Sequence, residues 1–334
     1  MTYINAISYY LPEGVLTNEM LNEQFPEWSV DKISGKTGIY QRHIASEDEF
    51  SSDLAYEAAT KLFREHQIDK EEIDFIILCT QSPDYFLPTT ACILQDRLGL
   101  SKNCGAFDFN LGCSGYVYGL GIAKGLVESG QASKVLLITA ETYSKFIGHR
   151  DKSNKTIFGD AAAASLVSKK EEGFKICDFV YGTDGSGAGN LIVKEGGIKH
   201  RKRNFLTTID DYGNERSEAD LYMDGSAIFV FTLGHVPKLI NAVLEKHQLA
   251  LGDVDLFVFH QANKFMLEHL RKKIKIEKDR FYIHIGNCGN TVSSTIPIAL
   301  YEALKEGKII SDQKIMLTGF GVGLSWGGTM LSSI

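Results

Sequence analysis

The chain lacks the sequence features that are typical of secreted, zinc-binding and membrane-spanning proteins. Its six cysteines are scattered over 334 residues without Cys-x-x-Cys spacing, which argues against a disulfide framework and against a zinc site. The segment from Met1 to Pro12 has neither the basic start nor the long apolar stretch of a secretory signal. We expect no membrane span, because no window approaches about 18 uncharged apolar residues. A soluble, cytoplasmic protein with reduced thiols is therefore expected.

The chain also lacks a net positive charge and the residue spacing of a phosphate-binding loop. The formal net charge is −7, so no global positive field favours nucleic acid or anionic lipid. The glycine-rich stretch from Gly182 to Gly189 lacks Gly-Lys-Ser/Thr, which excludes a phosphate-binding loop of that kind. The rest of the composition is ordinary: 44% hydrophobic and 23% charged residues allow a large core, and the length predicts roughly two domains.

A repeat with a spacing of about 180 residues organises the chain. The segment His66–Gln81 begins again 181 positions later as His247–Gln261, and both copies run through a polar turn into Asp and a buried apolar strand. A second pair, Lys134–Ile138 and Lys314–Thr318, follows at an offset of 180. Continuous apolar strands of this kind indicate sheets that helices cover on both faces.

The repeat predicts an α/β fold of two duplicated halves, residues 1–175 and 176–334. Each half carries a glycine-rich turn and a small-residue helix between its markers, Gly112–Leu126 in the first and Gly289–Leu304 in the second. Ligands in open α/β folds gather at the carboxyl ends of the strands. Residues that end equivalent strands are therefore expected to face the junction of the two halves.

Cys113 stands at such a strand end. An apolar run, Ala106–Leu111, stops at Gly112, and Ser114–Gly115 then opens a helix. A thiol at the first turn of a helix meets unpaired N–H groups and the positive end of the helix dipole, which favour the nucleophilic thiolate. Taken alone, however, Cys113 is as easily a small buried hydrophobe.

The repeat sets His260 and Asn290 opposite Cys113. His260 ends the strand equivalent to the one that Cys79 ends, and Asn290 lies in the turn before the second small-residue helix. A cysteine forms an acyl-enzyme from a thioester readily, and a His and an Asn donor suit a thioester oxygen that becomes an enolate. Singly, His260 would be a core or capping histidine and Asn290 a turn residue.

Six motifs follow one another in a specific order along nearly the whole chain. They are Lys36-Thr37-Gly38-Ile39 with Arg42-His43, Phe107-Asp108 to Gly115, Ile157-Phe158-Gly159-Asp160, His260-Gln261-Ala262-Asn263, Gly289-Asn290-Thr291, and Gly319 to Gly327. In this order the sequence resembles the thiolase-fold condensing enzymes, specifically the β-ketoacyl-[acyl-carrier-protein] synthase III group. The resemblance implies a five-layered α-β-α-β-α arrangement, a homodimer, and no metal or redox cofactor.

The resemblance also implies a two-step reaction. Cys113 would take an acyl group from a thioester, with the backbone N–H groups of Cys113 and Gly323 as the oxyanion hole. His260 and Asn290 would then stabilise the enolate that a malonyl thioester forms on losing carbon dioxide. This carbanion would attack the acyl-enzyme and give a β-ketoacyl thioester.

Two alternatives remain open at this point. One is acyl transfer without decarboxylation to an amine, alcohol or diketide in secondary metabolism. The other is a non-catalytic subunit that keeps the fold and binds a carrier protein, against which the intact Cys113, His260 and Asn290 weigh strongly. A plain thioesterase has no water-activating carboxylate specified in the sequence.

The positions that correspond to the family's substrate contacts are Lys32, Lys36, Lys152, Asn263 and Lys264. The first three of these lysines, and the residue two after Asn263, depart from the family's usual pattern. Lys32 stands where an aromatic residue usually stacks on the adenine of coenzyme A, and Phe265 stands where arginine is common. Lysine pairs with phosphate but offers neither the planar fork nor the stacking surface of arginine. We therefore expect acyl carrier protein to be at least as good a donor of the acyl chain as coenzyme A.

Two basic clusters agree with a carrier protein as partner. Lys199–Arg203 lies in a polar loop, roughly Gly182 to Asp220, and is either a solvated face or part of a lid or docking insert. Lys272 and Lys273 belong to a second cluster on a predicted helix after His260, where the family uses basic residues to dock its carrier. Such charges steer encounter more than they set affinity.

Leu87 precedes Pro88 in a segment that, in similar enzymes, reaches into the acyl pocket of the partner subunit. A bulky aromatic residue there keeps the pocket short, whereas leucine is smaller and flexible. We therefore expect the pocket to admit more than an acetyl group.

Overall fold

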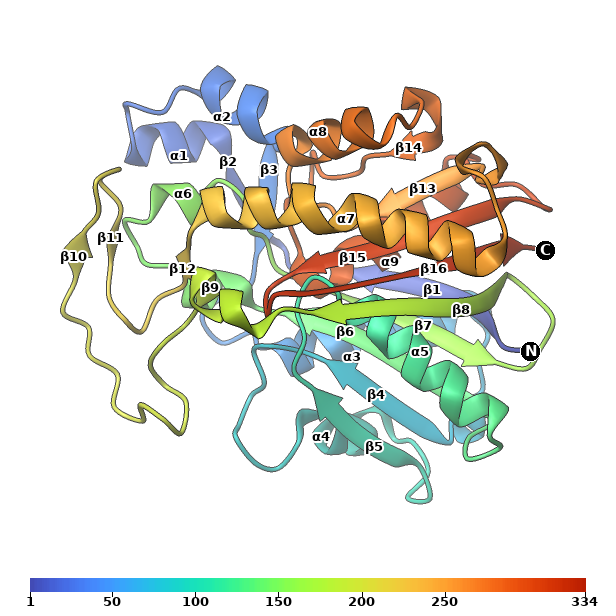
Figure 1. Cartoon of the computed structure of the whole chain (residues 1–334). Helices are drawn as coiled ribbons and strands as arrows, with labels where there is room; N and C mark the ends of the chain where they lie inside the picture. Colours follow the sequence, from blue (N-terminus) through green and yellow to red (C-terminus); the bar gives the residue numbers. More distant parts are fainter.

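The structure, a computed structural model, describes all 334 residues. A ten-stranded mixed sheet runs through the molecule in the order β14-β13-β15-β16-β8-β1-β7-β6-β4-β5 (Figure 1). Its strands are β1 (Tyr3–Tyr10), β4 (Phe75–Cys79), β5 (Gly105–Phe109), β6 (Lys134–Glu141), β7 (Ala161–Ser168), β8 (Phe174–Thr183), β13 (Leu256–Phe259), β14 (Phe281–Tyr282), β15 (Lys314–Gly321) and β16 (Ser325–Ser333).

The strand order repeats in the two halves of the chain. β4 pairs in parallel with β5 and β6, and its equivalent β13 pairs in parallel with β14 and β15. The two five-stranded halves meet where β1 pairs with β8 at only two positions, Tyr3 with Lys175 and Ile4 with Phe174. The expected boundary at residue 175 falls inside β8, the first strand of the second half.

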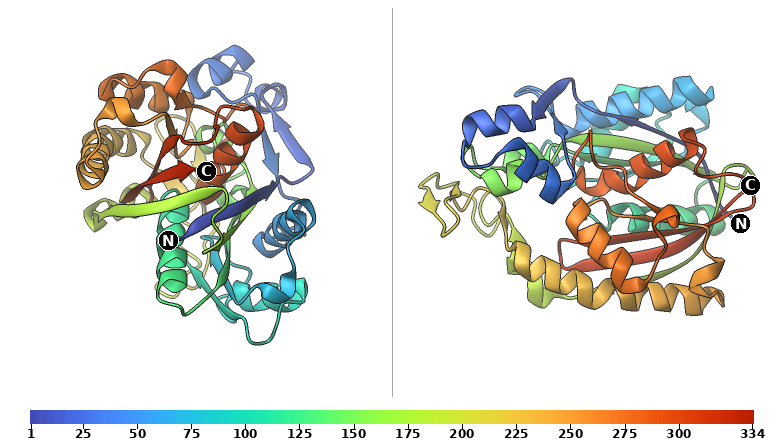
Figure 2. Two further views of the ribbon diagram at one scale, coloured as in Figure 1. Left: turned by 90° about the vertical axis from the view of Figure 1, so that its right-hand side faces the viewer. Right: turned by 90° about the horizontal axis from the view of Figure 1, so that it is seen from above.

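Helices form the other three layers. The core between the two half-sheets joins Val117 and Ile296, from the two central helices, to Ile77 of β4 and Val258 of β13. Separate cores lie under the outer helices of each half. The central helices are α5 (Gly115–Glu128) and α9 (Thr295–Lys305), and the outer ones are α3 (Ser51–His66), α4 (Thr90–Leu98), α7 (Gly225–His247) and α8 (Lys264–Ile274). The five-layered α-β-α-β-α thiolase fold is thereby confirmed, and Figure 2 shows it from the end.

The aspartate in each copy of the repeat has the same structural task. The Asp74 carboxylate accepts hydrogen bonds from the backbone N–H groups of Ser133 (2.7 Å) and Lys134 (3.0 Å), where β6 begins. Asp255 accepts one from the N–H of Lys314 (2.7 Å), where β15 begins. Each aspartate therefore fixes the start of the parallel strand next to its own, which explains why the motif recurs.

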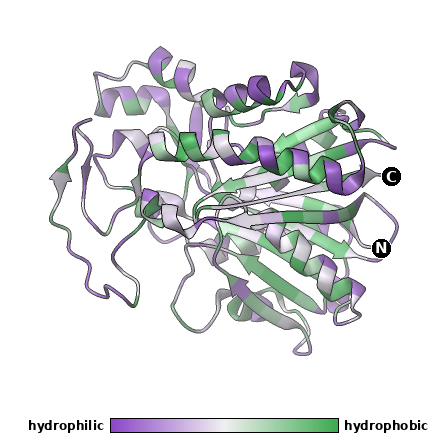
Figure 3. Ribbon diagram, in the orientation of Figure 1, coloured by the Kyte–Doolittle hydropathy of each residue, from purple (hydrophilic) through white to green (hydrophobic).

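Helix α7 corrects one expectation from the sequence. By length and composition alone it is apolar enough to cross a membrane, so the expectation that no stretch approaches such a composition is wrong. In the fold, its residues Ile228, Val236 and Val243 pack in one core with Met330 of β16. Figure 3 shows polar as well as apolar residues along its length. The apolar face of α7 is thus a covering layer of the second half-sheet.

Smaller elements surround the carboxyl ends of the central strands. They are β2 (Gly14–Thr17), α1 (Asn18–Gln24), α2 (Val30–Thr37), β3 (Gln41–Ile44), α6 (Lys152–Lys155), β9 (Leu191–Ile192), β10 (Thr208–Ile209), β11 (Glu215–Arg216) and β12 (Tyr222–Met223). The expected polar loop between Gly182 and Asp220 includes the hairpin β10–β11, which projects from the body at the left of Figure 1.

Candidate active site

Cys113 lies between β5 and α5, and only 6% of it is exposed. The end of β15 passes directly against it: a Cβ added to Gly321 would lie 2.7 Å from the Cys113 Cβ, and one added to Gly319 would lie 3.0 Å from the Cys113 carbonyl oxygen. Only glycine allows this close approach. The first half therefore supplies the thiol, and a strand of the second half forms the wall beside it.

The backbone donors at the thiol differ from expectation by one residue. The N–H groups of Val322 and of Cys113 itself lower the pKa of the Cys113 thiol, which places both near its sulfur. Gly323 instead faces Ser325, whose backbone nitrogen would lie 3.0 Å from a Cβ added there. The Val322 N–H is therefore a further candidate donor for an oxyanion hole, in the turn that also holds the expected Gly323. The turn is held by a Ser325 hydroxyl that donates to the Val322 carbonyl (2.9 Å).

The protonation of Cys113 also differs from expectation. Burial raises the pKa of its thiol to about 12, although the Val322 N–H acts in the opposite direction. α5 begins at Gly115 with Ser114 as its N-cap, so Cys113 lies just outside the first turn, where the helix dipole is weaker. Burial therefore favours the neutral thiol form of Cys113, which would need a base to become a thiolate.

His260 follows β13 and is held by three contacts. Its backbone N–H donates to the Thr318 carbonyl (2.8 Å), and its ring meets Phe320 edge-on with centroids 5.6 Å apart. Nδ1 lies 2.7 Å from the Thr295 hydroxyl oxygen. Because that hydroxyl donates to the Val292 carbonyl (3.0 Å), Nδ1 carries the proton and Nε2 is left without one. Burial lowers the pKa of His260 to about 3, so the ring is neutral.

Asn290 is oriented by its own loop. Its side-chain Oδ1 accepts a hydrogen bond from the Val292 N–H (2.9 Å), and its backbone N–H donates to the Ile157 carbonyl (2.9 Å). The amide Nδ2 forms no hydrogen bond within the protein, although Asn290 is only 4% exposed. The free group of this buried side chain is therefore a donor.

Val292 links the three residues. Its N–H binds Asn290, its carbonyl accepts from the Thr295 hydroxyl that contacts the His260 ring, and its side chain lies 3.1 Å from where Gly112, the neighbour of Cys113, would carry a Cβ. Its φ is 54°, an outlier for a β-branched residue, and such backbone strain clusters at functional sites. The sequence analysis predicted neither Val292 nor Thr295, because no sequence pattern indicates that a valine adopts a positive φ.

Glu141, at the end of β6, is a second residue that the sequence analysis missed. Its carboxylate is fully buried and accepts hydrogen bonds from the Gln81 N–H, the Ser82 hydroxyl and the Ser293 hydroxyl. Burial raises its pKa to about 8, and its charge also raises the pKa of Cys113. The available signal was a glutamate that ends a continuous apolar strand.

Glu141→Gln is expected to flatten the pH dependence of the free energy of unfolding between about pH 6.5 and pH 8. The folded state keeps a proton on Glu141 up to about pH 8, whereas the unfolded state releases it near pH 4.3, so stability falls as the pH rises through this window. The slope due to this residue is about 1 kcal/mol per pH unit. His260, with its lowered pKa, acts in the opposite sense only below about pH 6.5.

Urea unfolding at pH 6.5, 7.3 and 8 measures this slope. The exposed Glu57→Gln serves as the control and should leave the slope as it is in the unmodified chain. A Glu141→Gln protein with an unchanged slope would contradict the assignment.

The substrate-contact positions gather on two neighbouring helices. Lys32 and Lys36 are exposed on α2, and the stem of Lys264, the first residue of α8, lies against Gly38. An aromatic residue is present after all: the Trp28 ring has the Lys32 ammonium 5.1 Å and the Lys36 ammonium 6.0 Å from its centroid. Trp28 lies four residues before Lys32 and outside α2, whose N-cap is Ser29, so the comparison at position 32 missed it.

The remaining predicted contacts are more scattered. Lys152 on α6 pairs with Glu27 (2.7 Å) beside Trp28. Asn263 caps α8, its side-chain oxygen accepting from the Met266 N–H (2.8 Å), so its visible task is structural. Leu87 is 82% exposed in a segment shared with exposed Tyr85 and Phe86, and Lys272 and Lys273 are exposed in the last turn of α8, remote from its first turn.

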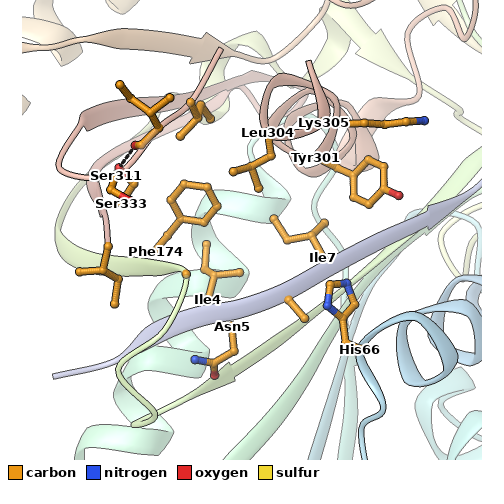
Figure 4. A pocket seen from close by; sticks show the side chains of 15 residues that line it. Ile4, Asn5, Ile7, His66, Phe174, Tyr301, Leu304, Lys305, Ser311 and Ser333 are labelled. Atoms are coloured by element: carbon orange, nitrogen blue, oxygen red, sulfur yellow. Dashed lines mark hydrogen bonds between the residues drawn. The ribbon is translucent and has the colours of Figure 1, made fainter. Parts of the chain in front are cut away.

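A separate cavity of about 530 Å³ lies at the opposite end of the strands (Figure 4). It is lined by Ile4, Ile7, Phe174 and Leu304, with His66 and Lys305 near its edge. None of the residues around Cys113 belongs to it. It is therefore not the site of the thiol chemistry.

Comparison with known proteins agrees with this geometry. The family model for 3-oxoacyl-[acyl-carrier-protein (ACP)] synthase III matches residues 107–185, and the model for its C-terminal part matches residues 244–333. A β-ketoacyl-[acyl-carrier-protein] synthase III from Fusobacterium nucleatum is 38% identical over 331 residues, which cover 98% of this chain and 97% of that protein. The chain belongs to the β-ketoacyl-[acyl-carrier-protein] synthase III family.

Solved structures of the synthase III family share the whole architecture. A crystal structure of 3-oxoacyl-(acyl-carrier-protein) synthase III has a TM-score of 0.96 and 48% identity, with 99% of each chain covered. The priming β-ketosynthase of the R1128 polyketide pathway has a TM-score of 0.83 and 27% identity, covering 99% of this chain and 96% of that one. The residues matched by the two family models include Cys113, His260, Asn290 and Val322.

Proposed function

We propose that this chain condenses a Cys113-bound acyl group with a malonyl thioester, by decarboxylative Claisen chemistry, to a β-ketoacyl thioester. The chain is a condensing acyltransferase of the synthase III family, and family membership favours this reaction over acyl transfer without decarboxylation. One observation carries the assignment of residues: Asn290 offers a free amide donor and His260 an unprotonated Nε2, and Val292 connects both to the turn at Gly112 that precedes the thiol.

The first step moves an acyl group onto Cys113. Because both groups are neutral at rest, the thiol passes its proton to the free Nε2 of His260 as its sulfur attacks the thioester carbon. The backbone N–H groups of Cys113 and Val322 stabilise the oxyanion of the tetrahedral intermediate. The proton then leaves with the departing carrier thiol.

The second step forms and uses a carbanion. The malonyl thioester oxygen accepts a hydrogen bond from Nδ2 of Asn290, and His260 supplies the second donor when the malonyl anion beside it favours the protonated ring. Loss of carbon dioxide leaves an enolate on this oxygen. The enolate carbon attacks the carbonyl carbon of the acyl group on Cys113, and the bond from that carbon to the sulfur breaks. The departing Cys113 thiolate then takes the proton from the protonated His260 ring.

Each step needs only the two thioesters, so we propose no metal or redox cofactor. We further propose a cytoplasmic homodimer in fatty acid or related secondary-metabolite assembly. Trp28, Lys32, Lys36 and Lys152 lie where a phosphate-bearing carrier would enter. Trp28 restores a stacking surface for coenzyme A, so both coenzyme A and acyl carrier protein thioesters are proposed as donors.

Intact-mass spectrometry tests the proposal. The protein is mixed first with an acyl thioester and then with malonyl-carrier protein. An acyl adduct on Cys113 followed by a condensed product, longer than the acyl group by two carbons, is expected. An adduct without condensation points to simple acyl transfer, and no adduct with any donor points to a non-catalytic subunit.

Leu87→Phe is expected to narrow the range of acyl chains. If the exposed Leu87 segment enters the partner's pocket, the present chain should accept C6–C12 as well as C2–C4 thioesters, and the larger ring should reduce kcat/KM for the longer group by about tenfold or more. Acylation rates across the C2–C12 series measure this. Val230→Phe, at an exposed position of α7, is the control. Strict acetyl preference in the unmodified chain would refute the expectation.

Lys272→Glu with Lys273→Glu is expected to weaken use of an acidic carrier protein. The two exposed ammonium groups at the end of α8 would steer such a partner, so their reversal should raise KM for carrier thioesters severalfold at low salt and leave kcat unchanged. Steady-state kinetics at 20 and 300 mM salt measure it. Equal loss with coenzyme A thioesters would show that α8 serves something other than docking.

A further inference from the structure

Residues 193–221 form an arm whose chemistry the active site does not use. The arm is closed at its base, where Leu191 and Ile192 of β9 pair with Met223 and Tyr222 of β12. Beyond that base it carries the hairpin β10–β11 and extends away from the body, as Figure 1 and the right view of Figure 2 both show. The cluster Lys199–Arg203 and the segment Phe205–Tyr212 belong to it.

The arm concentrates unpaired positive charge in a negatively charged protein. Lys199, Arg201, Lys202 and Arg203 are all exposed, and none forms a salt bridge. The chain as a whole has a formal net charge of −7. The six acidic residues of the arm, which balance its six basic residues in number, lie outside Lys199–Arg203 and form no salt bridge with that run. The positive charge is therefore local to the run, where it can act on a partner.

Exposed apolar side chains follow the cations directly. Phe205, Leu206 and Ile209 are 70%, 77% and 73% exposed. A solvated basic face alone would not place three large apolar residues next to it, whereas clustered exposed apolar residues mark interaction sites. The arm therefore presents cations and an apolar patch together.

The arm is anchored beside Lys152, one of the residues proposed to contact the carrier. Arg216 pairs with Asp151 (3.0 Å), and the Ser153 N–H donates to the Asn214 side chain (3.1 Å), so the arm is tied to both sides of Lys152. A Cβ on Gly213 would lie 3.2 Å from the Lys152 ammonium, which itself pairs with Glu27 beside Trp28. A macromolecule that delivers a thioester past Trp28 must approach next to this arm.

We propose that the arm is a docking surface for the acidic carrier protein that delivers the thioester. This inference rests on the proposed function and assigns it a partner surface other than α8. A phosphate-bearing small carrier could satisfy the cations but has no surface to cover Phe205, Leu206 and Ile209. A folded acidic protein covers both, and the thioester arm that it carries enters at Trp28.

A matched pair of charge reversals tests the surface. Lys202→Glu with Arg203→Glu should lower kcat/KM for an acyl-carrier thioester at least tenfold at 20 mM salt, through KM, and the loss should shrink at 300 mM. The same acyl group on coenzyme A should react as before. Lys169→Glu with Lys170→Glu makes the same charge change in the turn before β8, at the opposite end of that strand, and should alter neither. Phe205→Ser with Leu206→Ser, which keeps all charges, should weaken the carrier substrate alone at both salt concentrations.

Three results would overturn the proposal. They are unchanged kinetics with the carrier substrate, an equal loss with coenzyme A, and a change of oligomeric state in sedimentation, which would make the arm a contact between subunits. Fluorescence anisotropy of labelled carrier protein bound to the Cys113→Ala chain separates this inference from the proposed function. If the unmodified chain forms no β-ketoacyl product but the arm variants still lose carrier binding, the function is wrong and the docking surface stands. If the product forms and binding is unaffected, the reverse holds.

Discussion

Cys113→Ala abolishes acyl-enzyme formation while malonyl decarboxylation continues: this is the largest effect that we expect. The substitution removes the atom that carries the acyl group, so acylation should fall by about 10⁴-fold or more. It leaves His260 and Asn290 in place, and these are the groups that we propose to bind the malonyl thioester oxygen. Intact-mass spectrometry follows the adduct, and conversion of malonyl to acetyl thioester follows decarboxylation.

Cys79→Ala is the matched control for this substitution. Cys79 is also fully buried and ends the neighbouring strand, but its thiol donates to the Leu111 carbonyl (2.9 Å). Its loss should cost stability and leave the acyl adduct intact. If the adduct survives in Cys113→Ala and disappears in Cys79→Ala, the nucleophile has been assigned to the wrong strand end.

Asn290→Asp is expected to separate the two steps in the opposite direction. Aspartate keeps the oxygen that accepts from the Val292 N–H (2.9 Å), so the loop retains its anchor, but it removes the free amide donor and adds a negative charge. Malonyl decarboxylation should fall by about 10²–10³-fold, because the enolate loses a donor. Acylation of Cys113 should fall much less, since it uses the backbone donors.

Two further variants complete this test. Asn287→Ala, at an exposed position of the same loop, should leave both steps unchanged. His260→Ala should impair both, and decarboxylation the more severely, because His260 is a base in the first step and a donor in the second. Equal losses of acylation and decarboxylation in Asn290→Asp would rule out the enolate role.

The internal repeat made the fold and the central residues predictable. Matching strand ends place Cys113 in one half and His260 and Asn290 in the other, and the fold follows from buried strands that alternate with helices. The details that failed depend on backbone geometry at the strand ends. Whether the N–H of Val322 or that of Gly323 faces the Cys113 sulfur depends on a shift of one residue along the chain, and a hydrophobic pattern cannot predict such a shift.

Other features were hidden for different physical reasons. Val292 adopts a conformation that its side chain disfavours, so only the assembled site accounts for it. Glu141 lies in an apolar strand whose burial was clear, but its pKa depends on neighbours that come from three distant segments. Trp28 was overlooked because position 32 was read in isolation, although the chain that leads into α2 brings the Trp28 ring to 5.1 Å from the Lys32 ammonium.

The short seam between β1 and β8 has a mechanical consequence. Two residue pairs join the half-sheets, so the layer of α5 and α9, and not a continuous ladder, holds the two halves in alignment. Cys113 belongs to the first half, whereas His260 and Asn290 belong to the second. A relative displacement of the two halves by about 1 Å would be enough to slow the reaction about a hundredfold. The core that contains Val117 and Ile296 therefore keeps Cys113 aligned with His260 and Asn290 without contacting the substrate.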